Sequence, residues 1–314
     1  MEKLPAVALG TWSWGSGPVG GNQVFGNNLT VEQLRPVFNA AMKYGLNLWD
    51  TATVYGMGAS EDILGAFVKG EKSGDVVIST KFTPQIASDS DDAMMEMLNA
   101  SLHRLNTDSI DIYWIHNPAD VERWTPGLIK VLDSGKVKSV GVSNHNLAQI
   151  KRTEEILSAH GYHISAVQNH YSLLYRESEE AGIIDYCREN NMVFFAYMVL
   201  EQGAISGKYD TRHPLPADSM RGQTYNPQLA QIETLVDTMR KVAEVHNASV
   251  PQIGIAWAMA KGTLPLIGAT TVSHVEEAAG ASKIKLSAAE IKALEDAAAS
   301  TGAETRGSWE NPML

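Results

Sequence analysis

The sequence contains too few cysteine and basic residues for several classes of protein. Its single cysteine, Cys187, excludes a framework of intrachain disulfides and suits a reducing compartment. Lysine and arginine number 25 against 36 aspartates and glutamates, so the net charge is −11. No basic stripe is available to neutralise the phosphates of a nucleic acid, and we expect no nucleic-acid partner. Any anionic ligand must be held by local groups rather than by the overall field.

Long apolar runs and metal-binding motifs are also missing. No stretch approaches the ~18 apolar residues that cross a bilayer, and residues 1–5 lack the basic and apolar regions of a signal peptide. We therefore expect a cytoplasmic protein with no membrane partner. The sequence has no HExxH motif and no paired cysteines or histidines at ligand spacing, so no metal site is predicted.

Short apolar runs alternate with helical patterns along the chain, which is long enough for one large domain or two ordinary ones. A capping box at residues 30–33 opens one such helix. The alternation, without linkers, predicts a single α/β domain over residues 1–314: a (β/α)8 TIM barrel with an N-terminal extension, an inserted loop after strand seven and extra C-terminal helices. We expect that loop at about residues 203–228. The predicted strands cover residues 7–12, 46–50, 76–81, 110–116, 137–144, 165–169, 192–197 and 264–267.

Ionisable side chains gather where these strands end. Asp50, Lys81 and His116 end the second, third and fourth strands, and Tyr55 lies in the loop after the second. This edge of an α/β barrel binds ligands. Taken singly, each residue has a structural explanation: a turn cap, a solvated strand end, a satisfied core histidine or a packing tyrosine.

Together the four residues predict a chemical function. The carboxylate would orient the ammonium, and the ammonium would favour ionisation of the phenol. A histidine beside the same phenol can polarise a carbonyl. Together these four side chains could protonate an oxygen atom as it gains negative charge. A carbonyl oxygen gains negative charge when a hydride reaches the carbonyl carbon.

The pattern Asp50-Thr51-Ala52-x-x-Tyr55-Gly56 resembles the signature of the aldo-keto reductase family. The resemblance implies a barrel that binds a nicotinamide nucleotide without a Rossmann fold. It also implies a catalytic tetrad of Asp50, Tyr55, Lys81 and His116, with Tyr55 as the general acid. The resemblance extends from residue 9 to residue 281 and includes further motifs in the family's order, at residues 79–81, 115–116, 141–144, 167–169 and 267–269.

The resemblance further implies a path for the cofactor across the barrel mouth. Ser143, Asn144 and Gln168 would hydrogen-bond the nicotinamide carboxamide, and Tyr197 would stack on the ring. Near the reacting carbon and at the adenosine phosphate end, the implied contacts are Thr11, Trp12, Gly268, Thr270, His274 and Glu277. Independently, the pattern Ser273 to Glu276 predicts a capping box, and hence a helix whose free N–H groups suit a phosphate.

The chain departs from the family pattern at three places. After strand seven it reads AYMVLEQG, which introduces Glu201 near the expected pyrophosphate; this is unfavourable unless the side chain points away. Thr270 and Thr271 stand where an arginine or lysine often binds the ribose 2′-phosphate, and His274 replaces a glutamine or arginine. NADPH is nevertheless the expected cofactor, with NADH as the alternative. The predicted substitutes for the missing cation are Lys283 and Lys285.

The predicted function is NAD(P)H-dependent reduction of aldehydes or ketones to alcohols. Two alternatives stay open: a cofactor-binding, redox-sensing partner with little turnover, like the channel-associated members of the family, or an unrelated barrel enzyme using Asp50 and His116. The tail after Thr301 is short, so we expect an open pocket. An aromatic set suits a moderately apolar carbonyl compound, and its expected members are Trp12, Trp14, Phe25, Trp114 and Trp124.

Overall fold

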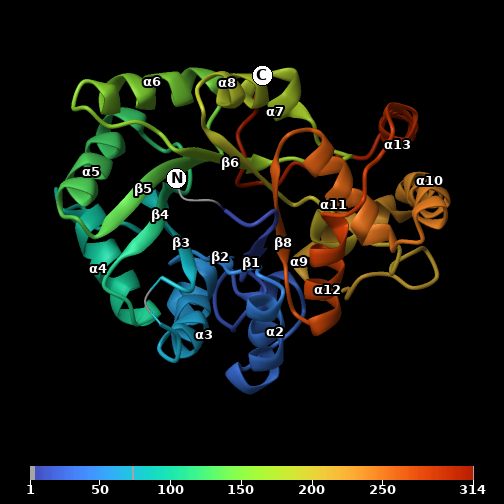
Figure 1. Cartoon of the computed structure of the whole chain (residues 1–314), viewed down its shortest axis with the longest axis horizontal. Helices are drawn as coiled ribbons and strands as arrows, with labels where there is room; N and C mark the ends of the chain where they lie inside the picture. Colours follow the sequence, from blue (N-terminus) through green and yellow to red (C-terminus); the bar gives the residue numbers. More distant parts are fainter. Residues whose placement is uncertain (1–3, 73, 314) are drawn as a thin grey trace.

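In the computed structural model, which describes residues 4–72 and 74–313, the strands close into a parallel barrel (Figure 1). Strand order follows the sequence, and β8 pairs with β1 to close the ring. The (β/α)8 barrel predicted from the sequence is therefore confirmed. Its strands are β1 Ala8–Gly10, β2 Leu48–Asp50, β3 Val77–Phe82, β4 Ile110–Ile115, β5 Val137–Ser143, β6 Ala166–His170, β7 Val193–Tyr197 and β8 Leu264–Gly268.

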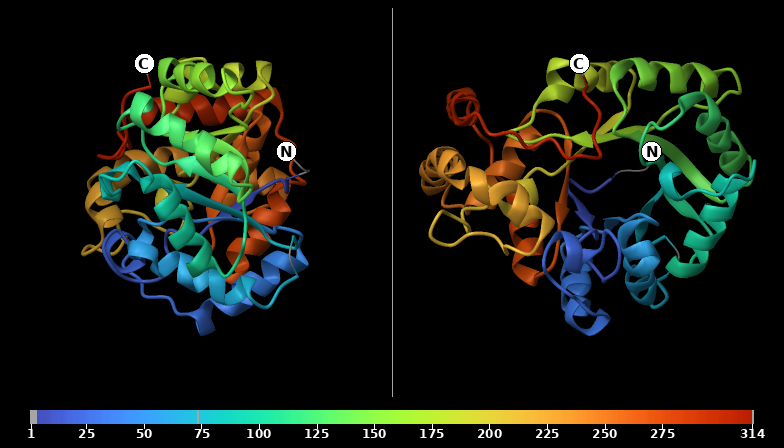
Figure 2. Two further views of the ribbon diagram at one scale, coloured as in Figure 1. Left: turned by 90° about the vertical axis from the view of Figure 1, so that its left-hand side faces the viewer. Right: turned by 180° about the vertical axis from the view of Figure 1, so that it is seen from behind.

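The helices lie outside the barrel and cover its strands (Figures 1 and 2). No helix in the described part of the chain is both long and apolar enough to cross a bilayer. The α-helices are α1 Gly21–Val24, α2 Val31–Lys43, α3 Ala59–Val68, α4 Ala93–Leu105, α5 Val121–Asp133, α6 Leu147–Ser158, α7 Glu177–Glu180, α8 Ile183–Glu189, α9 Met220–Tyr225, α10 Leu229–His246, α11 Val250–Ala260, α12 Val272–Ala281 and α13 Ala288–Thr301. Short 3₁₀ turns are η1 Tyr55–Gly58, η2 Pro84–Ile86, η3 Glu201–Gly203 and η4 Asn226–Gln228.

Local sequence signals explain most helix starts. α2 begins at the predicted capping box, in which the Thr30 hydroxyl accepts the Gln33 N–H and the Gln33 side chain accepts the Thr30 N–H. The capping box predicted at Ser273 is wrong. Thr271 caps α12 instead, because it has the extended backbone of an N-cap and its hydroxyl accepts the His274 N–H at 3.3 Å. The predicted loop after β7 also contains α9.

Alternation along the strands positions the candidate site. Side chains at positions i and i+2 of a strand share a face. Leu48 packs inside the barrel, so Asp50 points inward as well. On β4, Ile112 and Trp114 are inside, while Tyr113 packs outward against the helices. By the same alternation, residues at or near the ends of β3, β5, β6 and β7 point inward. They are Lys81, Ser143, Gln168 and Tyr197.

The interior of the barrel is filled at its centre by the Trp114 ring. Trp114 lies beside Gly141 in the β4–β5 register. A Cβ atom at Gly141 would lie 2.4 Å from two ring atoms of Trp114 and 2.7 Å from the carbonyl oxygen of Ala166. Since the last contact is to backbone, the neighbours cannot move aside easily.

We therefore expect Gly141→Ala to lower the free energy of unfolding by about 1–3 kcal/mol through overpacking. Denaturant unfolding followed by circular dichroism measures this loss. Gly70→Ala is the control, because the nearest atom to its added Cβ is at 3.5 Å. An equal loss in both variants would show that the packing around Trp114 is not tight.

Candidate active site

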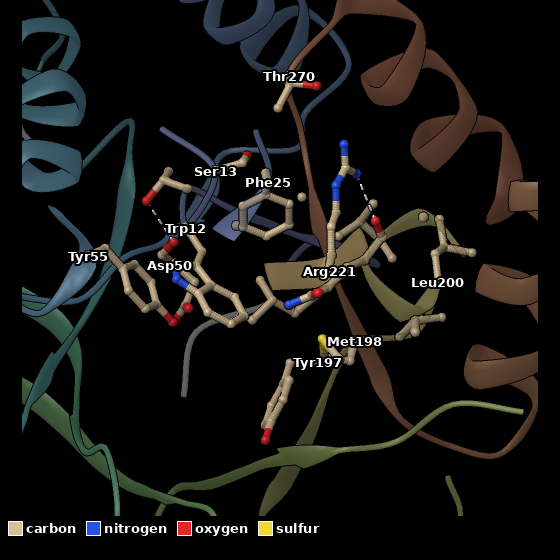
Figure 3. A pocket seen from close by; sticks show the side chains of 18 of the residues that line it. Trp12, Ser13, Phe25, Asp50, Tyr55, Tyr197, Met198, Leu200, Arg221 and Thr270 are labelled. Atoms are coloured by element: carbon tan, nitrogen blue, oxygen red, sulfur yellow. Dashed lines mark hydrogen bonds between the residues drawn. The ribbon is translucent and has the colours of Figure 1, made fainter. Parts of the chain in front are cut away.

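A cavity of about 1290 Å³ opens at the carboxyl ends of the strands (Figure 3). Lys81 lies beneath its floor and is fully buried. The structure thus brings the predicted tetrad and the predicted cofactor contacts to one place. The predicted residues that line the cavity are Thr11, Trp12, Asp50, Tyr55, His116, Ser143, Asn144, Gln168, Tyr197, Gly268, Thr270, His274 and Glu277.

Lys81 and Asp50 form a buried ion pair below Tyr55. The Lys81 ammonium also donates to the Thr51 carbonyl oxygen at 2.8 Å. The Asp50 carboxylate accepts from the Ser79 hydroxyl at 2.6 Å and from the Gln168 amide at 3.1 Å. These bonds compensate the loss of water around two charges, which would otherwise cost several kcal/mol for each ion.

Trp114 extends this network below the ion pair. Its indole N–H donates to the Ser79 hydroxyl at 2.6 Å, and that hydroxyl donates to Asp50. The ring that fills the barrel therefore also fixes the direction of the Ser79 hydrogen bond. Sequence reasoning placed Trp114 on the pocket wall, which is wrong, because it lies inside the barrel and is fully buried.

Tyr55 lies between the ion pair and the cavity. Its ring centroid is 5.2 Å from the Lys81 ammonium, and its ring meets that of His116 edge-on at 5.7 Å. Burial and the Asp50 charge raise the pKa of Tyr55 well above its ordinary value. Burial and the charge of Asp50 therefore outweigh the effect that we expected the Lys81 ammonium to have on this phenol. Tyr55 therefore carries its proton throughout the physiological pH range.

His116 completes the group in its neutral form. Burial, and secondly the charge of Lys81, hold its pKa well below the ordinary value. Its Nδ1 lies 3.1 Å from the Thr83 hydroxyl. When that hydroxyl donates to Nδ1, Nε2 carries the ring proton and can donate to an oxygen in the cavity.

The Asn144 side chain at the predicted nicotinamide position is held by hydrogen bonds to its neighbours on the barrel. Asn144 has a left-handed backbone with φ of 61°, and its amide donates to the His116 carbonyl oxygen at 2.9 Å. Its Oδ1 lies 2.6 Å from the Tyr197 hydroxyl. These contacts hold Asn144 and Tyr197 at fixed positions on the cavity wall.

The residues after β8 form the far end of the cavity. The Thr270 hydroxyl lies 3.2 Å from His274 Nδ1, and both side chains precede or enter the first turn of α12. Burial and the nearby Lys208 charge lower the pKa of His274, while Glu277 opposes that shift. His274 is therefore a weak source of positive charge for an anionic ligand.

A model of the Aldo/keto reductase family matches residues 6–299. The chain belongs to this family. Its relatives include the chloroplastic pyridoxal reductase of Arabidopsis thaliana, 31% identical, with 93% of this chain and 82% of that protein covered. The aldo-keto reductase yakc [NADP(+)] of Schizosaccharomyces pombe is 30% identical, with coverages of 94% and 89%. Among solved structures, the glycerol dehydrogenase of Gluconobacter oxydans matches with a TM-score of 0.81 and 25% identity, covering 98% of this chain and 96% of that one.

This aldo/keto reductase is an oxidoreductase, as its sequence predicted, and the alternative of an unrelated barrel enzyme is wrong. In the described residues, no group of three or more His, Cys, Asp or Glu side chains is placed to hold a metal ion.

Two cations in the reductase cavity were missed by sequence reasoning. Lys208 and Arg221 both come from the long segment between β7 and α10 and line the cavity. The Arg221 guanidinium lies 5.6 Å from the ring of Phe25 and donates to the Gln202 carbonyl oxygen at 3.0 Å, and Figure 3 shows it beside the cavity. The sequence did offer a signal for these two residues. Because the chain is acidic, an anionic ligand needs nearby cations, and Lys208 and Arg221 lie in the long segment predicted to cover the open end of the barrel.

The two lysines predicted to replace the missing cation at the ribose 2′-phosphate do not reach the cavity. Lys283 and Lys285 follow α12 and do not line the cavity. Glu201 was expected to be unfavourable near the pyrophosphate unless its side chain points away. The side chain does point away: it is fully buried and turned from the cavity towards His170, at 3.0 Å.

The C-terminal tail, residues 302–313, closes part of the cavity. It leaves α13 and crosses to α7, where the Met313 N–H donates to Glu177 at 3.0 Å (Figure 2). The tail residue Trp309 lines the cavity and packs edge-on against Trp12, with ring centroids 5.5 Å apart. The tail therefore covers part of the pocket that the sequence predicted to be open, since a short tail can still reach the barrel mouth.

The aromatic wall is smaller than predicted. Trp12 and Phe25 line it as expected, and Trp309 joins them. Trp14 and Trp124 belong to the core instead, packed against other aromatic rings at 5.0 and 4.8 Å.

A buried histidine lies behind the cavity wall. His170 is placed between the carboxylates of Glu201 at 3.0 Å and Glu310 at 3.1 Å, and stacks between the rings of Tyr175 and Tyr197. Burial opposes its charge, but the two carboxylates outweigh burial and raise the pKa of His170 to about 10. His170 is therefore a buried imidazolium at neutral pH.

This raised pKa makes the stability of the protein depend on pH. The ordinary value is 6.5, so the folded protein binds the His170 proton more tightly than the unfolded chain. The resulting stability is complete below pH 6.5 and is lost as the pH rises to about 10. We expect His170→Gln to be less stable than the wild type near neutral pH. The difference should narrow by at most about 1.4 kcal/mol per pH unit on going to alkaline pH.

Urea unfolding at several pH values measures the two free energies. His163→Gln is the control, because His163 is exposed and pairs with Glu154 at the surface. A stability difference for His170→Gln that stays constant with pH would show that His170 is uncharged.

Proposed function

We propose that the protein reduces aldehydes or ketones to alcohols with NADPH, and that Tyr55 is the general acid. The observation that carries the proposal is the buried Lys81–Asp50 pair directly beneath Tyr55, with neutral His116 at its edge. This group lies at the floor of a cavity of about 1290 Å³, which is large enough for a dinucleotide and a small substrate.

The residues of the cavity fit a nicotinamide nucleotide. Lys208 and Arg221 supply positive charge for its phosphates, and the N-terminus of α12 supplies backbone N–H groups. Asn144 and Gln168 are amides that suit a carboxamide, and Tyr197 offers an aromatic face. The name of the Schizosaccharomyces pombe relative includes NADP(+), which supports NADPH as the cofactor here, with NADH as the alternative.

The chain's own residues perform the proton transfer. When bound, a reduced nicotinamide supplies a hydride to the carbonyl carbon. His116 donates a hydrogen bond to the carbonyl oxygen, and Tyr55 gives that oxygen its proton. The raised pKa of Tyr55 keeps the proton on the phenol until it is needed. An alkoxide is a far stronger base than a phenolate, so the transfer is favourable, and Lys81 stabilises the phenolate that remains.

The residues around Tyr55 favour a flat carbonyl compound. Trp12 stacks on the Tyr55 ring at 5.7 Å, and Phe25 and Trp309 meet Trp12 edge-on. Polar side chains also line this part of the cavity, among them Gln85. An aromatic aldehyde with polar substituents fits both features. Pyridoxal is such a compound, and the name of the Arabidopsis relative makes it the first member of a test panel.

We expect the wild-type protein to oxidise NADPH with members of a panel of aromatic and aliphatic carbonyls. Tyr55→Phe should bind NADPH as the wild type does but lose about 10²- to 10⁴-fold in kcat, because only the proton donor is removed. Nucleotide absorbance measures turnover, and a fluorescence titration measures binding.

Tyr44→Phe is the matched control, since Tyr44 is exposed at the end of α2. Undiminished turnover in Tyr55→Phe would reject Tyr55 as the acid. Tight NADPH binding by the wild type without turnover of any carbonyl would favour a redox-sensing partner over an enzyme.

The second test concerns the 2′-phosphate of the cofactor. Lys208 lies close enough to His274 to shift its pKa, which places this cation at the far end of the cavity. We expect Lys208→Gln to weaken NADPH binding about 10-fold and to leave NADH binding nearly unchanged, because a charge-assisted bond is lost. Thr270→Arg should shift the preference further towards NADPH.

Lys285→Gln is the control for Lys208→Gln, because Lys285 does not line the cavity. A selective loss of NADPH binding in Lys285→Gln instead would show that the phosphate end is misplaced.

A further inference from the structure

The C-terminal tail carries a buried carboxylate to the wall of the cavity. Glu310 is almost fully buried, although it lies in a segment without regular secondary structure. Its Oε1 accepts the Tyr197 hydroxyl at 2.7 Å, and its Oε2 lies 3.1 Å from His170 Nδ1. The Gly307 N–H also donates to this carboxylate, at 3.2 Å. Each oxygen of Glu310 therefore has a partner within the protein.

Glu201 holds the opposite side of the same histidine. It lies 3.0 Å from His170 Nε2 and accepts the Tyr225 hydroxyl of α9 at 2.7 Å. The Thr305 hydroxyl of the tail donates to it at 3.1 Å. The tail is thus attached at two points around one buried imidazolium: Glu310 contacts His170 directly, and Thr305 contacts its other partner, Glu201.

These contacts determine where the Tyr197 ring lies. The ring stacks on that of His170 with centroids 5.6 Å apart and an interplanar angle of 25°. His170 in turn stacks on Tyr175 at 4.2 Å. Tyr197 also lines the cavity, so it presents to a ligand a surface whose tilt is set by the residues behind it (Figure 3).

Loss of the Glu310 carboxylate would disturb the stacked rings of Tyr197 and His170, which loss of an exposed charge would leave in place. The imidazolium would keep one carboxylate instead of two, and the Tyr197 hydroxyl would keep only Asn144. The buried His170 Nδ1 would be left without its partner, which is costly, and the Tyr197 ring would be held from one side only. The tail would also lose its anchor next to Trp309, which packs on Trp12.

We propose that Glu310 is a positioning residue: from the C-terminal tail it fixes Tyr197 as the surface on which the nicotinamide ring stacks. The inference rests on the proposed function, since it concerns the cofactor that function uses. It assigns the tail a part in cofactor binding, in addition to its place beside the substrate wall.

Glu310→Ala and Glu310→Gln test the proposal, with the dissociation constant of NADPH measured by fluorescence titration. Glu310→Ala should raise that constant about 10-fold, because a bond to a charged group is lost. Glu310→Gln keeps the size and one acceptor oxygen for Tyr197, so its effect should be smaller. Glu304→Gln, an exposed residue of the same tail, should bind NADPH as the wild type does.

A double-mutant cycle with Tyr197→Phe shows whether Glu310 acts through the tyrosine hydroxyl. We expect Glu310→Ala to raise the dissociation constant much less in the Tyr197→Phe background than in the wild type. Thermal melts of every variant report on folding. If Glu310→Ala does not fold, Glu310→Gln completes the same cycle.

If the wild type binds NADPH, two results would overturn the proposal. The first is a lowered melting temperature with unchanged NADPH binding in both Glu310 variants, which would reduce Glu310 to a structural role. The second is an equal effect of Glu310→Ala in both backgrounds of the cycle. Because every readout is binding, a wild type that binds NADPH but reduces no carbonyl overturns only the proposed function. A wild type that binds no nicotinamide nucleotide overturns both.

Discussion

The ion pair between Lys81 and Asp50 is the constraint on which the rest of this protein depends. Two charges removed from water are costly, and they persist only if every remaining lone pair and proton is bonded. Thr51, Ser79 and Gln168 supply those bonds. The donors and acceptors come from β2, β3 and β6, or from the residue that follows β2, so the closed barrel is a precondition for the pair. The pair in turn lies under Tyr55, so that this phenol meets both the ion pair and the cavity.

Charge is handled locally in an otherwise acidic molecule. The net charge of −11 does not attract an anionic cofactor, and the cavity compensates with Lys208 and Arg221. Glu201, the acidic residue nearest in sequence to the expected pyrophosphate, is directed into the protein and neutralised by His170. The same imidazolium also pairs with Glu310, so one buried cation partly compensates two carboxylates behind the wall of the cavity. The same side chains therefore both compensate charge and pack behind the wall of the cavity.

The sequence was sufficient to predict the barrel and the grouping of Asp50, Tyr55, Lys81 and His116 at its mouth, because both depend on short-range signals. Apolar runs mark strands, and a residue that ends a run in the correct parity, such as Asp50 or Lys81, must face the mouth. Lys208, Arg221 and Glu310 were missed because their positions depend on the path of irregular segments, which no periodicity records. The acidity of Tyr55 was misjudged for a different reason. Its pKa is controlled first by burial and then by Asp50, and the depth of a loop residue is not visible in the sequence.

The alternation of inward and outward side chains has a consequence for how such barrels can change over evolutionary time. Ser79 and Lys81 both serve the site because one outward residue separates them on β3. Insertion or deletion of a single residue within β3 would turn the lysine towards the helices and bring an apolar neighbour into the mouth. Changes of length are therefore expected in the loops, which carry Lys208, and in the tail. In the strands, only substitutions that keep the alternation of inward and outward side chains preserve the site.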